Sequence, residues 1–324
     1  MRFGRTPEQH AFSEALDDLL GAAEVPAAAR AWAAGDHSAG LKLWQRLAEL
    51  GVTGLLVPEE HGGVGATPVD LTVAFERLGY HGVPGPWIEA AAVAPALLEG
   101  SDDSAILSQV ASGETIVTVA APGGPYALDA DIAAKAYGVF DDIVVELTPD
   151  ALKPSVDPQR RLFIMSAGYP ITARIDPSSA RDLGTLACSA QLLGAGLRLL
   201  DDTVAYVKQR TQFGRPIGEF QAVKHLLADV RVALDFAAPL VHNAAVEIDA
   251  EVPTAARAVS AAKVAAGDAA YLASRTALQV HGAIGYTREF DLSLWILKVR
   301  ALVGAWGTPA DHRARILESL VECR

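Results

Sequence analysis

The sequence has few cysteines and no long uninterrupted apolar run, and these absences exclude several protein classes. It contains two cysteines, Cys188 and Cys323, without any Cys-x-x-Cys spacing, so neither a disulfide framework nor a thiolate metal site is expected. Every run of eighteen residues contains a charge or a glycine, and the N-terminus has no hydrophobic signal segment. We therefore expect two structural cysteines, no bound metal, no membrane span and a cytoplasmic protein.

Clustered basic residues are also missing. The chain has 27 Lys and Arg against 39 Asp and Glu, a formal net charge of −12 and a pI near 5.1. A phosphate backbone attracts clustered Lys and Arg, so nucleic-acid binding is not expected. What is present is typical of globular proteins: 51% of the 324 residues are apolar and 20% charged, with 28 Gly and 18 Pro. This length is enough for two or three domains.

The first hundred residues carry the signals of helix starts. Thr6 is a predicted N-cap, with Pro7 after it and Gln9 closing a capping box. Thr67, followed by Pro68, starts a further helix in the same way. Helices are expected at 6–20, at 38–51, from 67 onward and at 86–100.

The pattern changes after this helical region. Short β-branched runs separated by Gly, Pro and Asp predict strands at 114–121, 141–148 and 160–167. Helical periodicity returns from Asp182 onward in four or five long segments. We therefore predict an α+β chain with an N-terminal helical domain (1–112), a reduced middle β domain (113–180) and a C-terminal helical bundle (181–324).

Residues 209–218, QRTQFGRPIG, interrupt two long helical segments. A linker would be less distinctive than an arginine, an aromatic residue and a glycine in close succession. The helix dipole favours an arginine at a helix end, which is one explanation of Arg210. A guanidinium is also suited to paired, charge-assisted hydrogen bonds to phosphate oxygens, which is the other.

Three stretches together resemble the acyl-CoA dehydrogenase family. They are LAELGVTGLLVPEEHGGVGATPVDLTVAFERLG near the N-terminus, RTQFGRPIGEFQAVKHLLADV, and LQVHGAIGYTREFDL about seventy residues later. The resemblance covers almost the whole chain. It implies an N-terminal helical domain, a middle β-barrel and a C-terminal four-helix bundle that bind FAD and oxidise an acyl-CoA to its 2,3-enoyl thioester.

The resemblance also implies cofactor-binding residues. In the family the arginine and phenylalanine of the helix break contact the FAD of the neighbouring subunit, which assigns Arg210 and Phe213 to its pyrophosphate and adenine end. The residues assigned to the adenosine part by the second motif are Gln279, Val280, His281 and Gly282. Glycine allows close backbone approach to a ligand, whereas His281 is equally explained as a packing histidine at a helix end.

Two departures from the family pattern bear on catalysis. The loops that grip the flavin ring are missing, because APGGPYALDADI runs almost directly into AYGVFDDIVVELTPDAL, so this chain is not expected to build a full flavin cradle. The stretch that matches the family's catalytic glutamate is Ala305-Trp306-Gly307-Thr308. Tryptophan cannot abstract a proton, and its bulk fills space that an acyl chain needs.

Some family members carry the base on an earlier helix, eleven residues before the glutamine of the second motif. That position is Asp268. A Gly-Asp pair inside an alanine-rich helix is locally unfavourable, so a tertiary reason for it is plausible. An aspartate on the solvent face of the helix explains the residue as well.

Three functions remain open from the sequence. The first is a subunit of a heterotetrameric FAD-dependent acyl-CoA dehydrogenase, with a full-length paralogue that supplies the flavin cradle. Enzymes of this two-gene kind resemble those that actinobacteria use on bulky, steroid-derived acyl-CoA thioesters. The second is a self-sufficient homo-oligomeric dehydrogenase that uses Asp268. The third is a non-catalytic interaction subunit that keeps the fold without cofactor.

Overall fold

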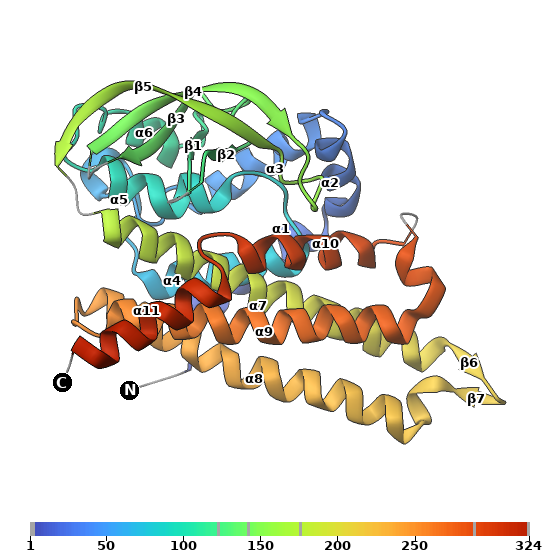
Figure 1. The fold of residues 1–324 in the computed structure, drawn as a ribbon. Helices are drawn as coiled ribbons and strands as arrows, with labels where there is room; N and C mark the ends of the chain where they lie inside the picture. Colours follow the sequence, from blue (N-terminus) through green and yellow to red (C-terminus); the bar gives the residue numbers. More distant parts are fainter. Residues whose placement is uncertain (1–3, 122–123, 141–142, 175–176, 288–289, 323–324) are drawn as a thin grey trace.

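The computed structural model describes residues 4–121, 124–140, 143–174, 177–287 and 290–322. Figure 1 shows a small sheet on one side of the molecule, a set of long helices on the opposite side, and the N-terminal helices beside and beneath the sheet. The sequence-predicted order of helices, strands and helices is confirmed. Cys188 is buried, as expected, and Cys323 lies outside the described residues.

The N-terminal region consists of short and medium helices. They are α1 (Pro7–Gly21), α2 (Val25–Ala33), α3 (Ser38–Glu49), η1 (Glu59–His61), α4 (Pro68–His81), the π-helix η2 (Ile88–Val93), α5 (Ala94–Leu98) and α6 (Ile106–Ala111). Both predicted capping boxes are confirmed. The Thr6 hydroxyl accepts a hydrogen bond from the Gln9 amide while the Gln9 side chain accepts one from the Thr6 amide, and Thr67 and Asp70 do the same at α4.

The middle region is a five-stranded sheet. Its strands are β1 (Val117–Val119), β2 (Tyr126–Leu128), β3 (Lys135–Phe140), β4 (Ile143–Lys153) and β5 (Leu162–Arg174), in the order β1-β3-β4-β5-β2. β1 pairs parallel with β3, and the other pairs are antiparallel. The Thr118 hydroxyl donates to the Leu128 carbonyl at 2.7 Å, so the two edge strands approach each other. The predicted strand 141–148 begins with two residues outside the described ranges.

The C-terminal region is built from long helices. Its elements are α7 (Pro177–Gln209), β6 (Thr211–Gln212), β7 (Arg215–Pro216), η3 (Ile217–Glu219), α8 (Gln221–Asp249), α9 (Ala255–His281), η4 (Gly282–Tyr286), α10 (Leu292–Gly304) and α11 (Pro309–Glu322). Figure 1 shows α7, α8, α9 and α10 running back and forth side by side. α11 packs on α9 as a fifth helix.

Helix α7 joins the N-terminal and C-terminal helices. Where α4 crosses α7, a Cβ at Gly79 would lie 2.2 Å from the Gln191 carbonyl oxygen, and one at Gly194 would lie 1.9 Å from the Glu76 carbonyl oxygen. Only glycine permits so close a crossing. One 18-residue window of α7 is apolar enough to span a membrane by length and composition, but 89% of it is buried inside the protein. Its apolar character is therefore explained by the core.

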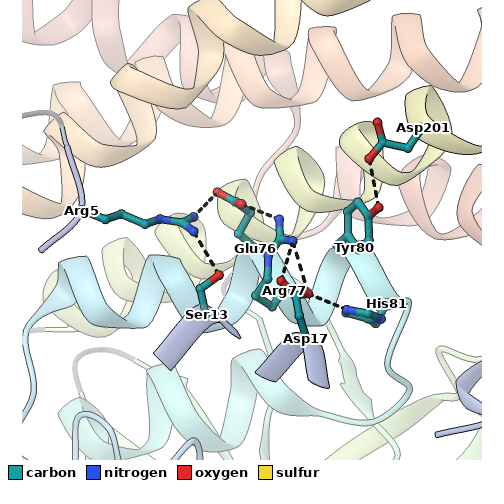
Figure 2. A network of polar contacts seen from close by, with 8 residues as sticks. All are labelled: Arg5, Ser13, Asp17, Glu76, Arg77, Tyr80, His81 and Asp201. Carbon is teal, nitrogen blue, oxygen red and sulfur yellow. Dashed lines mark hydrogen bonds and ion pairs between the residues drawn. The ribbon is translucent and has the colours of Figure 1, made fainter. Parts of the chain in front are cut away.

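Polar contacts connect α1, α4 and α7 around this crossing (Figure 2). The residues drawn are Arg5, Ser13, Asp17, Glu76, Arg77, Tyr80, His81 and Asp201. Asp17 of α1 lies 2.7 Å from Nε2 of His81 and 3.3 Å from the guanidinium of Arg77, both on α4. Burial lowers the pKa of His81 more than Asp17 raises it. The imidazole therefore acts as a neutral hydrogen-bonding partner that fixes α1 against α4.

Candidate functional site

A short hairpin replaces the regular helix at the end of α7. β6 pairs with β7, and the two residues between them, Phe213 and Gly214, have φ of 52° and 81°. Positive φ at both central positions is the requirement of a type I′ turn, for which phenylalanine is unfavourable. The Phe213 side chain is nonetheless 93% exposed. In Figure 1 this hairpin projects from the end of the helical bundle, away from the sheet.

Arg210 lies at the base of the hairpin and is exposed. Its amide donates to the Tyr206 carbonyl at 2.9 Å, and its carbonyl accepts from the Ile217 amide at 2.8 Å. The backbone is thus fixed while the guanidinium remains in solvent. Nearby, the Arg215 guanidinium lies 4.2 Å from the Phe220 ring centroid, so it is held by a cation–π contact.

The second sequence motif lies at the end of α9, beside the end of α7. The two ends are joined by the His281 ring, which stacks on Tyr206 with centroids 4.2 Å apart. Gln279 is exposed and Val280 is partly buried. Gly282 has φ of 64° and ψ of −137°, and no heavy atom lies within 4 Å of a Cβ built there. The structure therefore brings the two predicted cofactor-binding motifs to the same end of the bundle.

His281 is a packing residue in this arrangement. It is 5% exposed, and its Nδ1 lies 2.8 Å from the Ala277 carbonyl, which can only accept a hydrogen bond. Burial lowers the pKa of His281, outweighing the effects of that hydrogen bond and of Asp202. The ring is therefore neutral and holds α9 against α7, while the residues around it face solvent.

A separate cavity of about 530 Å³ lies between the sheet and the turn that joins α10 to α11. Its apolar walls include Val119, Leu128, Leu162, Ala301 and Ala305. Its polar lining includes Glu89, Tyr126, Arg160, Arg300, Trp306, Thr308 and Asp311. The volume is in the range of small-molecule sites, roughly 300–1,000 Å³.

Trp306 is built firmly into this cavity. It is 4% exposed and has φ of 57°. His312 Nε2 donates to the Trp306 carbonyl at 2.9 Å, and the buried Lys263 donates to the Leu302 and Val303 carbonyls, each at 3.0 Å. A Cβ at Gly184 of α7 would lie 2.7 Å from Cε3 of the indole. The indole is thus a fixed part of the cavity wall.

Glu89 is a polar residue of the cavity that no sequence motif indicated. It lies in the π-helix η2 and is 3% exposed, and its Oε2 has no hydrogen-bond partner among the described residues. Burial raises the pKa of Glu89, and this outweighs the lowering by the Arg160 charge, by a backbone hydrogen bond and by the Trp306 indole. The Trp306 indole is near enough to the Glu89 carboxyl to lower its pKa, although neither Glu89 Oε2 nor Trp306 Nε1 has a hydrogen bond of good geometry to a described residue. Burial thus shifts the Glu89 carboxyl toward its neutral form.

Asp268 lies elsewhere. It is on α9, its side chain is 61% exposed, and its Oδ2 accepts from the Arg313 guanidinium at 2.8 Å. It is absent from the lining of the cavity. The structure therefore does not bring Asp268 together with Trp306, Glu89 or the bundle end, and its role as a base remains a prediction.

Comparison with known proteins identifies the family. Residues 6–114 match the acyl-CoA dehydrogenase N-terminal domain, and residues 180–321 match the acyl-CoA dehydrogenase C-terminal domain. Acyl-CoA dehydrogenase IpdE2 of Mycobacterium tuberculosis is 32% identical over 321 residues, which cover 95% of this chain and 96% of IpdE2. The chain belongs to the acyl-CoA dehydrogenase family, whose members are oxidoreductases acting on CH–CH groups and use FAD.

Two solved structures share the fold over nearly the whole chain. The steroid acyl-CoA dehydrogenase Tcur3481–Tcur3483 has a TM-score of 0.86 at 21% identity and covers 98% of each chain. The ChsE4–ChsE5 complex of Mycobacterium tuberculosis has a TM-score of 0.82 at 20% identity, with 99% of each chain covered. The resemblance stated from the sequence is thus confirmed.

The residues at the bundle end fit part of an FAD molecule. The open space at Gly282 admits a ligand close to the backbone, and Phe213 presents an exposed ring on which a base can stack. Arg210 has an exposed guanidinium suited to phosphate oxygens. The chain's own cavity, by contrast, holds a fixed tryptophan and a buried glutamate. Only the adenosine and pyrophosphate half of the cofactor fits the residues assigned to it.

Proposed function

We propose that this chain is one subunit of a heteromeric FAD-dependent acyl-CoA dehydrogenase that forms a 2,3-enoyl-CoA. In this proposal a full-length paralogue supplies the flavin cradle and the base, and the acyl-CoA is bulky and steroid-derived. The supporting observation is that the residues suited to FAD are exposed at the bundle end while Trp306 closes part of the chain's own cavity. FAD, when bound, supplies the hydride acceptor.

Each residue at the bundle end has a defined task in this proposal. Arg210 binds the pyrophosphate of the partner's FAD, and Phe213 packs against its adenine. Gln279 and Gly282 contact the adenosine part, with Gly282 allowing the close approach. Val280 and His281 hold the end of α9 in place beneath them. None of these residues moves a proton.

The names of similar proteins support the heteromeric and steroid parts of the proposal. IpdE2 is related over almost its whole length, a structural neighbour is described as a steroid enzyme, and another is a complex of two named chains. These names describe the other proteins. For this chain, the partner and the steroid-derived acyl group are parts of the proposal.

The test compares the chain expressed alone with the chain co-expressed with a full-length paralogue from the same genome. We expect the lone chain to be colourless or poorly soluble and the complex to be yellow, with enoyl-CoA formed from a steroid-derived thioester faster than from butyryl-CoA. Visible spectra, native mass and turnover measure this. A yellow, stoichiometric FAD complex of the lone chain would overturn the heteromeric proposal and favour the homo-oligomeric alternative.

Arg210→Ala in the complex tests the bundle end directly. A charge-assisted contact is worth about 1.5–3 kcal/mol, so FAD retention should weaken roughly ten- to a hundred-fold, and the native mass should not change. Arg231→Ala is the matched control, because Arg231 is an exposed arginine of α8 that forms an ion pair with Asp235 at 2.9 Å. Unchanged FAD affinity in the Arg210 variant would remove this residue from the site.

A further inference from the structure

A closed ring of contacts joins α2 and the α2–α3 turn to the end of the sheet at which β5 begins (Figure 1). Trp32 of α2 donates from Nε1 to Oδ1 of Asp129 at 3.1 Å, and the Asp129 amide donates to the Arg161 carbonyl at 2.7 Å. The Arg161 guanidinium lies 2.6 Å from Nε2 of His37, which is in the turn. The His37 ring meets the Trp32 ring nearly edge-on, with centroids 4.7 Å apart, and so closes the ring of contacts.

The contact with Arg161 indicates which form of His37 the folded protein uses. A guanidinium carries only hydrogen-bond donors, so His37 Nε2 is the acceptor and the imidazole is neutral. Burial, and then the Arg161 charge, lower the pKa of His37 from its ordinary value of 6.5, against the opposite effects of Asp131 and Asp36. The hydrogen bond and the electrostatic surroundings therefore agree on a neutral ring.

The two carboxylates that act on His37 through their charge have other partners. Asp131 accepts from both terminal nitrogens of the Arg161 guanidinium, at 2.8 Å and 2.6 Å. Asp36 accepts from the Ser38 amide at 3.0 Å. Within the part of the chain that the structure describes, neither forms a hydrogen bond or an ion pair with His37. A protonated His37 would thus face the Arg161 guanidinium without a carboxylate partner of its own.

We propose that His37 is a pH-sensitive latch, which holds the α2–α3 turn against Arg161 while its ring is neutral and releases the turn when the ring is protonated. The added proton comes from solvent and binds Nε2, the atom that accepts the hydrogen bond from Arg161. That hydrogen bond is then lost, and two cations face each other at the same contact. Arg161 stays with Asp131, and the imidazolium moves toward water.

The latch supports a stretch of chain that borders the cavity. Arg160 and Leu162, the neighbours of Arg161 in the sequence, both line the cavity. Release of the turn should therefore loosen this part of the wall. None of the residues of the latch is assigned to FAD, and the latch is tested on the protein without cofactor or substrate. Its failure is thus distinguishable from a failure of the proposed function.

The latch contributes to stability with a defined sign. The pKa of His37 is lower in the folded protein than in the unfolded chain, so there is a pH range in which only the unfolded chain binds the proton. The contribution is therefore complete above pH 6.5 and is lost as the pH falls below it. Asp129 titrates with the opposite sign, because burial raises its pKa. It is present in every protein compared below, so its effect cancels in the differences.

Two variants of His37 separate the latch from packing alone. His37→Gln keeps an oxygen that accepts from Arg161 and cannot be protonated in this range, so the latch should stay closed at about pH 5. His37→Phe keeps a ring against Trp32 but has no acceptor, so the latch should be open at every pH. His225→Gln is the matched control, because His225 is an exposed histidine of α8. It should behave like the wild type.

Hydrogen–deuterium exchange of the purified full-length chain, corrected for the intrinsic pH dependence of exchange, measures the opening. In the wild type, peptides covering residues 31–42 and 159–165 should exchange roughly tenfold faster at about pH 5 than at about pH 7.5. In His37→Gln they should stay protected at both, and in His37→Phe they should exchange fast at both. Peptides of α8 should not change, which distinguishes local release from global unfolding.

A titration of the His37 ring by NMR tests the cause. The pKa of His37 should lie below 6.5 in the wild type and should rise in Arg161→Met, because the neighbouring cation is removed. A pKa of 6.5 or above in the wild type, or one that Arg161→Met leaves unchanged, would overturn the proposal. So would equal protection of the wild type at the two pH values, or the same loss of protection in His37→Gln.

Discussion

Glu89 and Trp306 lie together in the wall of the cavity. Lys263 and His312 hold the backbone around Trp306 through hydrogen bonds to the Leu302 and Trp306 carbonyls, and Gly184 of α7 packs closely against the indole. Burial raises the pKa of Glu89 and so favours its neutral form.

The ion pair of Asp268 leads to a prediction for turnover. Asp268→Asn in the co-expressed complex should leave turnover within a few-fold, because in the proposed function the base lies on the partner. Folding should be little affected, because exposed ion pairs contribute about 0–1 kcal/mol. A general base, when lost, costs typically two to four orders of magnitude. Asp235→Asn is the matched control, since Asp235 is also exposed and paired with an arginine. Abolished turnover with full flavin content in the Asp268 variant alone would place the base in this chain.

Asp129 gives a prediction for the pH dependence of stability. It is fully buried, with φ of 51°, and its Oδ1 accepts from Trp32 Nε1 at 3.1 Å while Oδ2 has no partner among the described residues. Burial raises its pKa to about 7. The folded state therefore binds a proton that the unfolded state has lost, and this contribution to stability disappears as the pH rises toward 7.

Asp129→Asn removes this titration and keeps the acceptor for Trp32. The wild type should lose free energy of unfolding relative to the variant between pH 5 and about 7, and the difference should be constant above that. Urea unfolding of both proteins across this range measures it. Parallel pH profiles of the two proteins would show that Asp129 is ionised in the folded state.

At the scale of elements, the sequence predicted what depends on local chemistry. The caps at Thr6 and Thr67 are local hydrogen bonds and are confirmed. Strands β2 and β3 were not predicted, because β2 is three residues long and the run KAYGVF of β3 contains a glycine and no strict alternation. Their pairing with distant strands fixes them. A helix was predicted at 86–100, but nothing in the local sequence indicated that Ile88–Val93 forms a π-helix.

The residues of the candidate sites also differ in whether the local sequence could predict them. The bundle-end residues could be predicted because they form two motifs with a characteristic spacing. Glu89 could not, because a single glutamate in PWIEAAAVAP is indistinguishable from one on a solvent face. Its burial results from tertiary contacts of η2 with α7 and β1. Trp306 was predicted as the odd residue at the base position, and its supporting contacts were visible only in the structure.

The crossing of α7 with the Trp306 turn gives a prediction for stability. In Gly184→Ala the new methyl would lie 2.7 Å from the indole and 2.9 Å from Val93, so we expect a loss of about 1–3 kcal/mol. Gly267→Ala on α9 is the control, since a Cβ there meets nothing within 4 Å and alanine in a helix is favoured by roughly 0.5–1 kcal/mol. Thermal unfolding measures both. A stability gain in both variants would mean that the turn adjusts freely.

At the scale of the whole molecule, α7 contacts α4 and α5 on one side and α8, α9 and α10 on the other. We therefore expect one cooperative unfolding transition and not separate transitions for the N-terminal and C-terminal regions. The fluorescence of the five tryptophans, which lie in both regions, should change together with the far-UV circular dichroism. Two resolved transitions would show that the regions fold independently.

The glycine crossing between α4 and α7 also has a consequence for synthesis on the ribosome. The face of α4 around Gly79 is covered by α7 residues near Gly194, which are translated about a hundred residues later. At roughly 5–20 residues per second, this face stays uncovered for about 5 to 20 seconds. The emerging N-terminal helices therefore present an apolar surface to the cell throughout that interval. Chaperones that bind nascent chains are therefore expected to bind this surface during that interval, before α7 packs against it.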